Sequence, residues 1–335
     1  VDPTAGFFYE DARSFFSSSA DGGSVTDGGA GEHLTTTRNV YTNVAGNSLT
    51  DAGNRVHPSN TNITAAALGV DGETDAATLR TWVLNWARGI DVLDEDSDGS
   101  TSDARHSLGD PLHSEPVVVD YGGTEANPDL QIFMGTNQGY LHAFSSRTLQ
   151  EEFAFVPKEL LGNFYPYYLN RGSHTNRPYG VAGPIVSTTT ESGAKMLIVG
   201  MRRGGAMYYA LDISTRNQPK VKWVITPSST GFSGLGQSWS TPQIAKVQIG
   251  ASVKKVAIFG GGYDVAQDTP ESAPITDSVG QMVYMVDLDT GSLIWSAGNL
   301  ANSPILPMTD MKASIPGTPR AIDLDEDDVI DRMYV

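Results

Sequence analysis

The stretch GQMVYMVDLDTGSLIWSAG, residues 280–298, decides the fold class. Two apolar segments rich in Val, Tyr, Ile and Trp flank the sequence Asp287-Leu288-Asp289-Thr290-Gly291. Asp and Gly are residues that tight turns use, and β-branched and aromatic residues favour strands. The stretch therefore predicts a β-hairpin. Asp212 and Trp223 occupy related places in an earlier segment, so the pattern repeats.

Outward from this hairpin, the repeat extends over residues 113–335. Each copy has a proline at the start of its first apolar strand: Pro116, Pro184, Pro242 and Pro319. The intervals are 68, 58 and 77 residues (184 − 116, 242 − 184 and 319 − 242). In the first three copies a glycine follows the second apolar strand: Gly135, Gly200 and Gly260. A unit of several short strands exposes two apolar faces that only its neighbours can cover.

These repeats predict an all-β protein built as a partial β-propeller. The chain holds three blades and the start of a fourth, whereas propellers have at least four. We therefore expect it to be a truncated part of a longer protein.

The region before the repeats has a different composition. Residues 1–90 are rich in Gly, Ser, Thr, Asn and Asp, which predicts loops with short helices, over 7–16 and more clearly over 75–88. In the second helix Asp75 is a candidate N-cap and Gly89 a stop signal. Its apolar stripe is predicted at Leu79, Trp82, Val83 and Trp86. Residues 91–112 form an acidic linker to the first blade.

Composition excludes several functions. The formal charge is −17, and clusters of Lys and Arg are missing, so binding to nucleic acid is not expected. The chain has no cysteine, which excludes disulfides and thiol catalysis. No apolar run is long enough for a membrane span. The absence of cysteine and the high acidity fit a protein exported to an extracellular, cation-rich setting.

The acidic stretch DLDEDDVID, residues 323–331, predicts a calcium site. Side-by-side carboxylates repel, but folded around a cation they bind it. Ca²⁺ takes six to eight oxygens in a flexible loop. The predicted ligands are Asp323, Asp325, Asp327, the Val329 carbonyl and Asp331, in a loop between the two strands of a hairpin. Position 6, usually Gly, is Asp328 here, and a solvated acidic turn is the alternative.

A second acidic stretch follows the 75–88 helix. Asp94, Asp96 and Asp98 have the same alternating spacing, and Gly99 stands at position 6. The further predicted ligands are Ser100 and Asp103. Position 12 is Arg105, which cannot bind a cation, and an acidic linker without metal is the alternative.

Several motifs together resemble the C-terminal region of the PilY family of type IV pilus biogenesis and tip-associated adhesin proteins. They include LGDPLHSEPVVVDYG (108–122), GTNQGYLHAFSS (135–146) and FAFVPKELL (153–161). The resemblance implies quinoprotein-like propeller blades and Ca²⁺ loops at the two acidic stretches. It also implies a non-enzymatic role in pilus extension and retraction, twitching motility and surface adhesion. The expected partners are pilins, the type IV pilus machinery and host or abiotic surfaces, and the expected location is the pilus or outer surface, reached through the periplasm.

Two other functions remain open at this point. The blade pattern also resembles that of PQQ-dependent alcohol dehydrogenases, although those have more blades and often adjacent cysteines beside the quinone. A generic extracellular binding propeller without a pilus role is the second alternative.

Overall fold

The computed structural model describes residues 28–170, 177–269 and 276–335, together with isolated positions between 3 and 21. Half of the residues in the helix predicted over 7–16 lie outside the described residues. The chain forms two compact units. The first comprises residues 1–110 and 118–178, and the second comprises 111–117 and 179–335.

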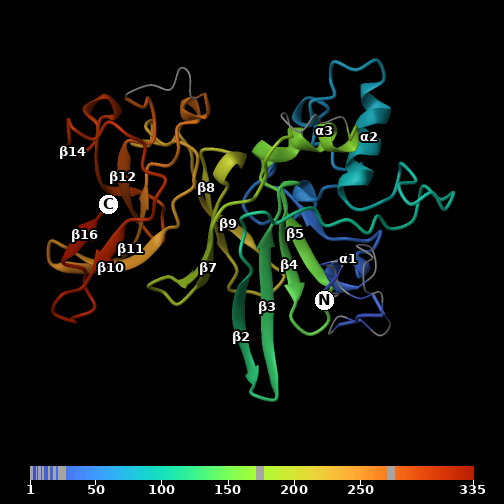
Figure 1. The fold of residues 1–335 in the computed structure, drawn as a ribbon, viewed down its shortest axis with the longest axis horizontal. Coiled ribbons are helices and arrows are strands. Elements are labelled where there is room, and N and C mark those ends of the chain that lie inside the picture. Colours follow the sequence, from blue (N-terminus) through green and yellow to red (C-terminus); the bar gives the residue numbers. More distant parts are fainter. Residues whose placement is uncertain are drawn as a thin grey trace. The chain divides into compact units, whose positions relative to one another are not determined.

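The first unit contains one five-stranded sheet. Its order is β1-β5-β4-β3-β2, and β1 is parallel to β5. The other strands form an antiparallel meander, shown side by side in green in Figure 1. The strands are β1 (Val40–Tyr41), β2 (Val117–Thr124), β3 (Asn127–Gly135), β4 (Leu141–Ser145) and β5 (Glu151–Phe155). This meander is the first predicted blade, and it lies in the same unit as the linker over 91–110.

Short helices make up most of the other regular structure of this unit. They are α1 (Gly29–Glu32), η1 (Ala52–Asn54), η2 (Ala66–Leu68), α2 (Ala76–Ala87), η3 (Lys158–Asn163) and α3 (Phe164–Tyr168). The helix predicted over 75–88 is confirmed as α2, because the Asp75 side chain caps it by accepting from the Thr78 amide at 3.2 Å. The predicted apolar stripe is wrong at Trp82, which is 51% exposed. The buried side is formed by Val83, Leu84, Trp86 and Ala87.

The second unit contains the other blades. One four-stranded antiparallel sheet has the order β6-β7-β8-β9. Its strands are β6 (Ile185–Thr189), β7 (Lys195–Gly200), β8 (Tyr208–Asp212) and β9 (Lys220–Ile225). The next sheet has the order β10-β11-β12-β13-β14, with β14 parallel to β13. Its strands are β10 (Gln243–Ile249), β11 (Ser252–Gly260), β12 (Met282–Asp287), β13 (Leu293–Gly298) and β14 (Leu306–Pro307).

A two-stranded antiparallel sheet completes the second unit. It consists of β15 (Arg320–Ile322) and β16 (Arg332–Tyr334). The short helices of the unit are η4 (Arg202–Gly204), η5 (Val265–Asp268) and η6 (Leu300–Asn302). Three four-stranded meanders followed by two further strands confirm the prediction of an all-β, propeller-type fold.

Prolines and glycines mark the strand ends, as the sequence predicts. Each of the four prolines stands immediately before the first strand of its repeat, at β2, β6, β10 and β15. Proline lacks a backbone donor and is tolerated at such a position. The three glycines are the last residues of β3, β7 and β11. At Gly260 a Cβ atom would lie 2.3 Å from the Ile315 carbonyl oxygen, so the close approach requires glycine there.

Alternating side chains fill the space between the blades of the second unit. On β11, Ala257 and Phe259 pack against the β6–β9 blade, whereas Val256 and Ile258 face the other side, where Ile330 and Met333 pack. This period of two is the strand geometry that lets one sheet contribute to two cores. The turn after β12 also contacts the neighbouring blade, because the Trp223 indole on β9 donates to the Leu288 carbonyl at 3.0 Å.

Among the described residues, no helix is long and apolar enough to cross a membrane.

Candidate metal-binding loops

The first acidic stretch forms the loop between β15 and β16. The hairpin closes where the Asp331 amide donates to the Ile322 carbonyl at 2.9 Å. One carboxylate oxygen from each of Asp323, Asp325 and Asp327 lies within 4.8 Å of those of the other two. The predicted hairpin and its first three ligands are therefore brought together.

Backbone amides fold the loop around its first aspartate. The Glu326 and Asp328 amides each donate to Asp323 at 2.8 Å, one to each carboxylate oxygen. The Asp331 carboxylate accepts from the Leu324 amide at 2.8 Å, which places it across the loop. The Val329 amide donates to Asp327 at 2.8 Å, and the role of its carbonyl group as a ligand stays a prediction.

The carboxylates of this loop repel one another. Asp327, then Asp331 and more weakly Asp323, raise the pKa of Asp325. A bound cation would offset this repulsion, because opposite charge nearby favours the ionised carboxylate. The oxygen-only donor set fits a hard cation such as Ca²⁺.

Position 6 of this loop holds Asp328 in place of the usual glycine. Its φ is +70°, the left-handed conformation that normally favours glycine. The side chain forms an ion pair with Lys246 on β10. The Ile330 amide donates to the Lys246 carbonyl at 2.9 Å, so the loop is attached to β10 through side chain and backbone alike.

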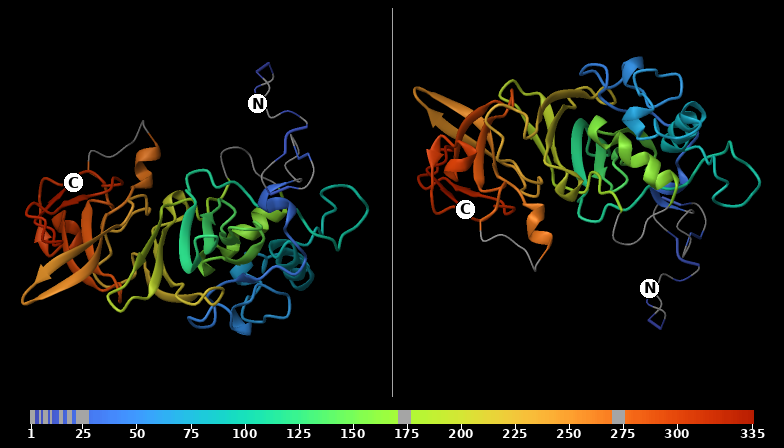
Figure 2. Two further views of the ribbon diagram at one scale, coloured as in Figure 1. Left: turned by 90° about the horizontal axis from the view of Figure 1, so that it is seen from below. Right: turned by 90° about the horizontal axis from the view of Figure 1, so that it is seen from above.

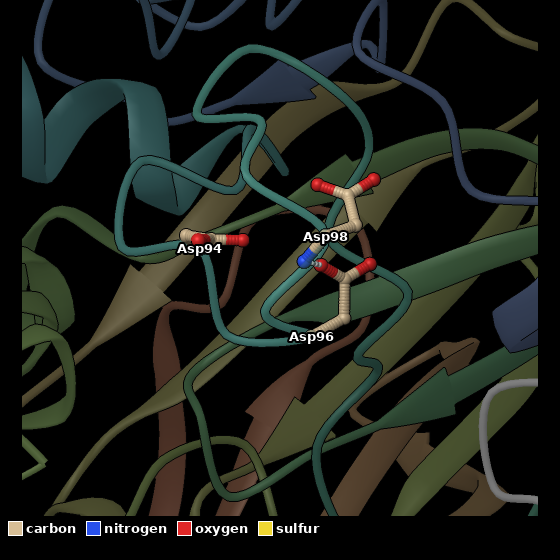
Figure 3. A group of neighbouring side chains, drawn as sticks. All are labelled: Asp94, Asp96 and Asp98. Carbon is tan, nitrogen blue, oxygen red and sulfur yellow. Dashed lines mark hydrogen bonds between the residues drawn. The ribbon is translucent and has the colours of Figure 1, made fainter.

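The second acidic stretch forms a loop that projects from the helices of the first unit, seen in teal in both views of Figure 2. An antiparallel bridge between Ile90 and Ala104 closes its base. Figure 3 shows the carboxylates of Asp94, Asp96 and Asp98, and their oxygens again lie within 4.8 Å of one another. The structure thus brings these three predicted ligands together.

The loop turns through amide-to-carboxylate bonds. The Gly99 amide donates to Asp94 at 3.0 Å, the Asp98 amide to Asp96 at 3.3 Å, and the Ser100 amide to Asp98 at 2.7 Å. Gly99 has φ +88°, which explains the glycine at position 6. Asp103, the last predicted ligand, lies at the base, where its carbonyl accepts from the Asp91 amide at 3.1 Å.

The buried carboxylate of Asp91 was not predicted from the sequence. This residue is 2% exposed, and its Oδ1 atom has no hydrogen-bond partner among the residues that the structure describes. The Oδ1 atom of Asp103 is buried and unpartnered in the same sense. Unsatisfied buried carboxylate oxygens need an explanation, and an ion is one. Asp91 lies outside the alternating pattern, so spacing could not reveal it.

Arg105, at position 12 of this loop, contacts helix α2. Its guanidinium lies 4.0 Å from the centre of the Trp86 ring, and its Nη1 lies 3.9 Å from the Glu95 carboxylate. The Trp86 indole donates to Glu95 at 3.0 Å. Both ends of the loop are therefore attached to α2 at a single tryptophan.

A buried ionic group in the first unit was also missed. Arg38 donates to both oxygens of Glu151, at 2.6 and 2.9 Å, and the His142 Nδ1 atom lies 2.6 Å from Glu151. All three side chains are at most 3% exposed. Burial alone would raise the pKa of Glu151, but Arg38 and His142 lower it to about 2. Arg38 and His142 stand in two of the family motifs, RNVYT (38–42) and GTNQGYLHAFSS (135–146), but nothing in the sequence pairs them with Glu151.

Comparison with known proteins identifies relatives. No family model matches the chain. The type IV pilus biogenesis factor PilY1 of Pseudomonas aeruginosa is 28% identical over 330 aligned residues, covering 89% of this chain and 26% of that protein. A PilY1 homologue of Xylella fastidiosa is 27% identical over 203 residues, covering 53% of this chain and 16% of the homologue.

A crystal structure described as the C-terminal domain of Pseudomonas aeruginosa PilY1 overlaps 61% of this chain and 36% of that chain. Its TM-score is 0.41 and its sequence identity is 23%. The chain spans about a quarter of the length of the PilY1 relative, which is 26% covered.

Proposed function

The resemblance to PilY1, a type IV pilus biogenesis factor, is confirmed over most of the chain, and from it we propose a calcium-binding, non-enzymatic module of a pilus-associated protein. The observation that carries the metal part is the convergence of Asp323, Asp325 and Asp327 in the β15–β16 loop. Ca²⁺ would supply the positive charge that this loop lacks, and the loop offers oxygen donors only.

In this proposal Asp323, Asp325, Asp327 and Asp331 hold the ion, together with the Val329 carbonyl. The amides that donate to Asp323 preform the loop, so fewer backbone torsions must be fixed on binding. The ion pair between Asp328 and Lys246 links the loop to β10. Ordering of the loop by Ca²⁺ would therefore also restrain β10, an edge strand of the last complete blade.

The second loop is proposed as the second calcium site. Asp94, Asp96 and Asp98 form its ligand group, and Ser100 and Asp103 would complete it. The unpartnered Oδ1 atom of Asp103 supports this assignment. Because Glu95 and Arg105 contact Trp86, ordering of the loop is expected to change the environment of that indole.

The proposed setting is the pilus or the outer cell surface. The partners would be pilins and other parts of the type IV pilus machinery, with host or abiotic surfaces as adhesion targets. Loops with and without Ca²⁺ would present different surfaces to that machinery. Pilus extension, retraction and twitching motility would then respond to Ca²⁺.

Calorimetric titration with Ca²⁺ after treatment with EDTA tests the metal sites. We expect binding by the native chain, loss of one site in Asp327→Ala and loss of the other in Asp96→Ala. Asp310→Ala removes an exposed aspartate outside both loops and should titrate as the native chain does. A native chain that binds nothing at millimolar Ca²⁺ would leave both stretches as solvated turns and end the calcium proposal.

A second experiment addresses the pilus role and its rivals. Mechanically sheared pili should carry the parent protein, as detected by immunoblot. Its absence from pili, with the protein still on the cell surface, would favour a generic extracellular binding propeller. A quinone absorption band in the purified protein would favour the PQQ-dependent dehydrogenase alternative.

A further inference from the structure

Three polar side chains share one face of the first unit: Tyr41, Arg55 and His57. Tyr41, on β1, pairs with Arg55 in an antiparallel bridge. Residues opposite each other in such a pair have their side chains on the same side, with Cβ atoms about 4.5–5.5 Å apart. Arg55 has extended backbone (φ −73°, ψ 130°), so His57, two residues further along, points to that side as well. The phenol, the guanidinium and the imidazole therefore lie together.

Arg88, the C-cap residue of α2, adds a second guanidinium to this face. Its Nη1 atom donates to the Thr36 carbonyl and its Nε atom to the Asn85 side chain, both at 3.1 Å. Burial and then the positive charges of Arg88 and Arg55 lower the pKa of His57. Burial and then Arg55 lower the pKa of Arg88, so the three basic groups lie within electrostatic range of one another. We call these four side chains the basic face: Tyr41, Arg55, His57 and Arg88.

No carboxylate balances the positive charge of the basic face. In the described part of the chain, neither Arg55 nor Arg88 forms an ion pair with an acidic side chain. No acidic group contributes to the pKa shifts of His57 and Arg88 either. Acidic residues outnumber Lys and Arg by 39 to 22 in the whole chain, so basic groups that meet without a carboxylate are not expected by chance. The two arginines, which stay protonated, leave a double positive charge for an anion from solution.

The donors of the basic face are open to solvent. Arg55 is exposed. The Arg88 Nη2 and His57 Nε2 atoms make no hydrogen bond within the described residues, and neither is among the buried unpartnered atoms there, so water reaches both. The His57 Nδ1 atom accepts from the Ser59 amide at 3.1 Å, so the neutral ring carries its proton on Nε2. That nitrogen is therefore a free donor.

We propose that the basic face binds a tetrahedral dianion, a phosphate or sulfate group. Two negative charges balance the two guanidinium groups, whereas a single carboxylate would leave one of them unbalanced. The donors come from β1, from residues 55–57 and from the end of α2, and such separate directions suit a tetrahedral ion better than a planar one. The group belongs to a free ion or a small molecule, because the chain's charge of −17 repels polyanions. None of these residues belongs to either acidic loop.

Calorimetric titration of the 335-residue chain with inorganic phosphate tests the proposal, at about pH 8, where phosphate is doubly charged. Low ionic strength limits screening, and EDTA removes Ca²⁺. Sulfate should bind as phosphate does, and acetate at least tenfold more weakly. Arg55→Gln should weaken phosphate binding at least tenfold, the effect of losing one charged hydrogen bond. Arg320→Gln removes an exposed arginine in the second unit and should leave the affinity unchanged. Methyl phosphate that binds equally well identifies a phosphate ester as the source, and weaker binding identifies the free ion.

NMR titration of the histidine side chains gives a second, local readout. Sulfate should raise the pKa of His57 above its value in chloride of equal ionic strength, because a bound anion favours the charged imidazole. An unchanged His57 titration, or phosphate binding that Arg55→Gln does not weaken, would overturn the assignment. So would acetate that binds as tightly as phosphate, or no saturable binding at about 20 mM phosphate, twentyfold above a millimolar Kd. Because neither experiment contains Ca²⁺, the calcium proposal can fail without affecting this test.

Discussion

At the scale of single residues, the ionic group of Arg38, Glu151 and His142 has the largest expected energetic effect. A buried ion pair adds little net stability compared with an apolar core, but the loss of one partner leaves a charge uncompensated. Arg38 reaches Glu151 from 113 residues away in sequence, so the pair also fixes the N-terminal segment to the first blade.

Glu151→Gln tests this role. The substitution keeps the shape and removes the negative charge that faces Arg38. We expect the free energy of unfolding to fall by about 3–5 kcal/mol, measured by urea denaturation. Glu125→Gln, at an exposed site in the β2–β3 turn, should change it little. Equal changes in the free energy of unfolding for the two variants would contradict a large effect of the buried pair.

The same group predicts how stability depends on pH. Burial lowers the pKa of His142 from its ordinary 6.5, and its contact with Glu151 does not reverse this shift. As pH falls below 6.5, the unfolded chain takes up a proton that the folded chain does not, so stability decreases. Glu151, with a pKa of about 2 instead of 4.5, adds a further loss as pH falls from 4.5 towards 2.

Urea denaturation at several pH values checks this dependence. His142→Gln should flatten the dependence of the free energy of unfolding on pH between about pH 7 and 5. An unchanged slope in His142→Gln would mean that other groups govern the acid response.

At the scale of elements, glycines at the ends of second strands allow close backbone contacts. Gly260→Ala would place its Cβ 2.3 Å from the Ile315 carbonyl oxygen, and this backbone must shift. We expect a loss of roughly 1–3 kcal/mol, as for other overpacked sites. Gly317→Ala, where nothing lies within 4 Å of the new Cβ, is the matched control. Thermal unfolding of both variants measures this loss, and equal midpoint temperatures would contradict the expected destabilisation by Gly260→Ala.

The sequence predicts these elements well because their signals are local. The prolines before β2, β6, β10 and β15 and the acidic loops at 94–98 and 323–331 are each contained in a few residues. Asp91, the Glu151 group and the exposure of Trp82 depend on residues that fold next to them from elsewhere. Strand β1 was not predicted, because two residues carry too little periodicity to reveal a strand.

At the scale of the molecule, a bound ion should stabilise the folded chain by mass action. With free Ca²⁺ a hundredfold above Kd, one site adds about 2.7 kcal/mol to the free energy of unfolding. The melting temperature measured by calorimetry should therefore rise in Ca²⁺ and return to its original value in excess EDTA. Asp327→Ala should lose the part of the shift that belongs to the β15–β16 loop. A melting curve indifferent to Ca²⁺ would refute the linkage.

The pairing of β1 with β5 sets an order of events in folding. Each meander forms from strands that are neighbours in sequence, but Val40 pairs with Ala154, which lies 114 residues further along the chain (154 − 40). Closing so long a loop costs entropy, and such distant contacts form late. The first blade should therefore assemble before residues 38–41 dock on its edge. The desolvation of Arg38 and Glu151 then belongs to this last step, so early in folding both charges are still hydrated.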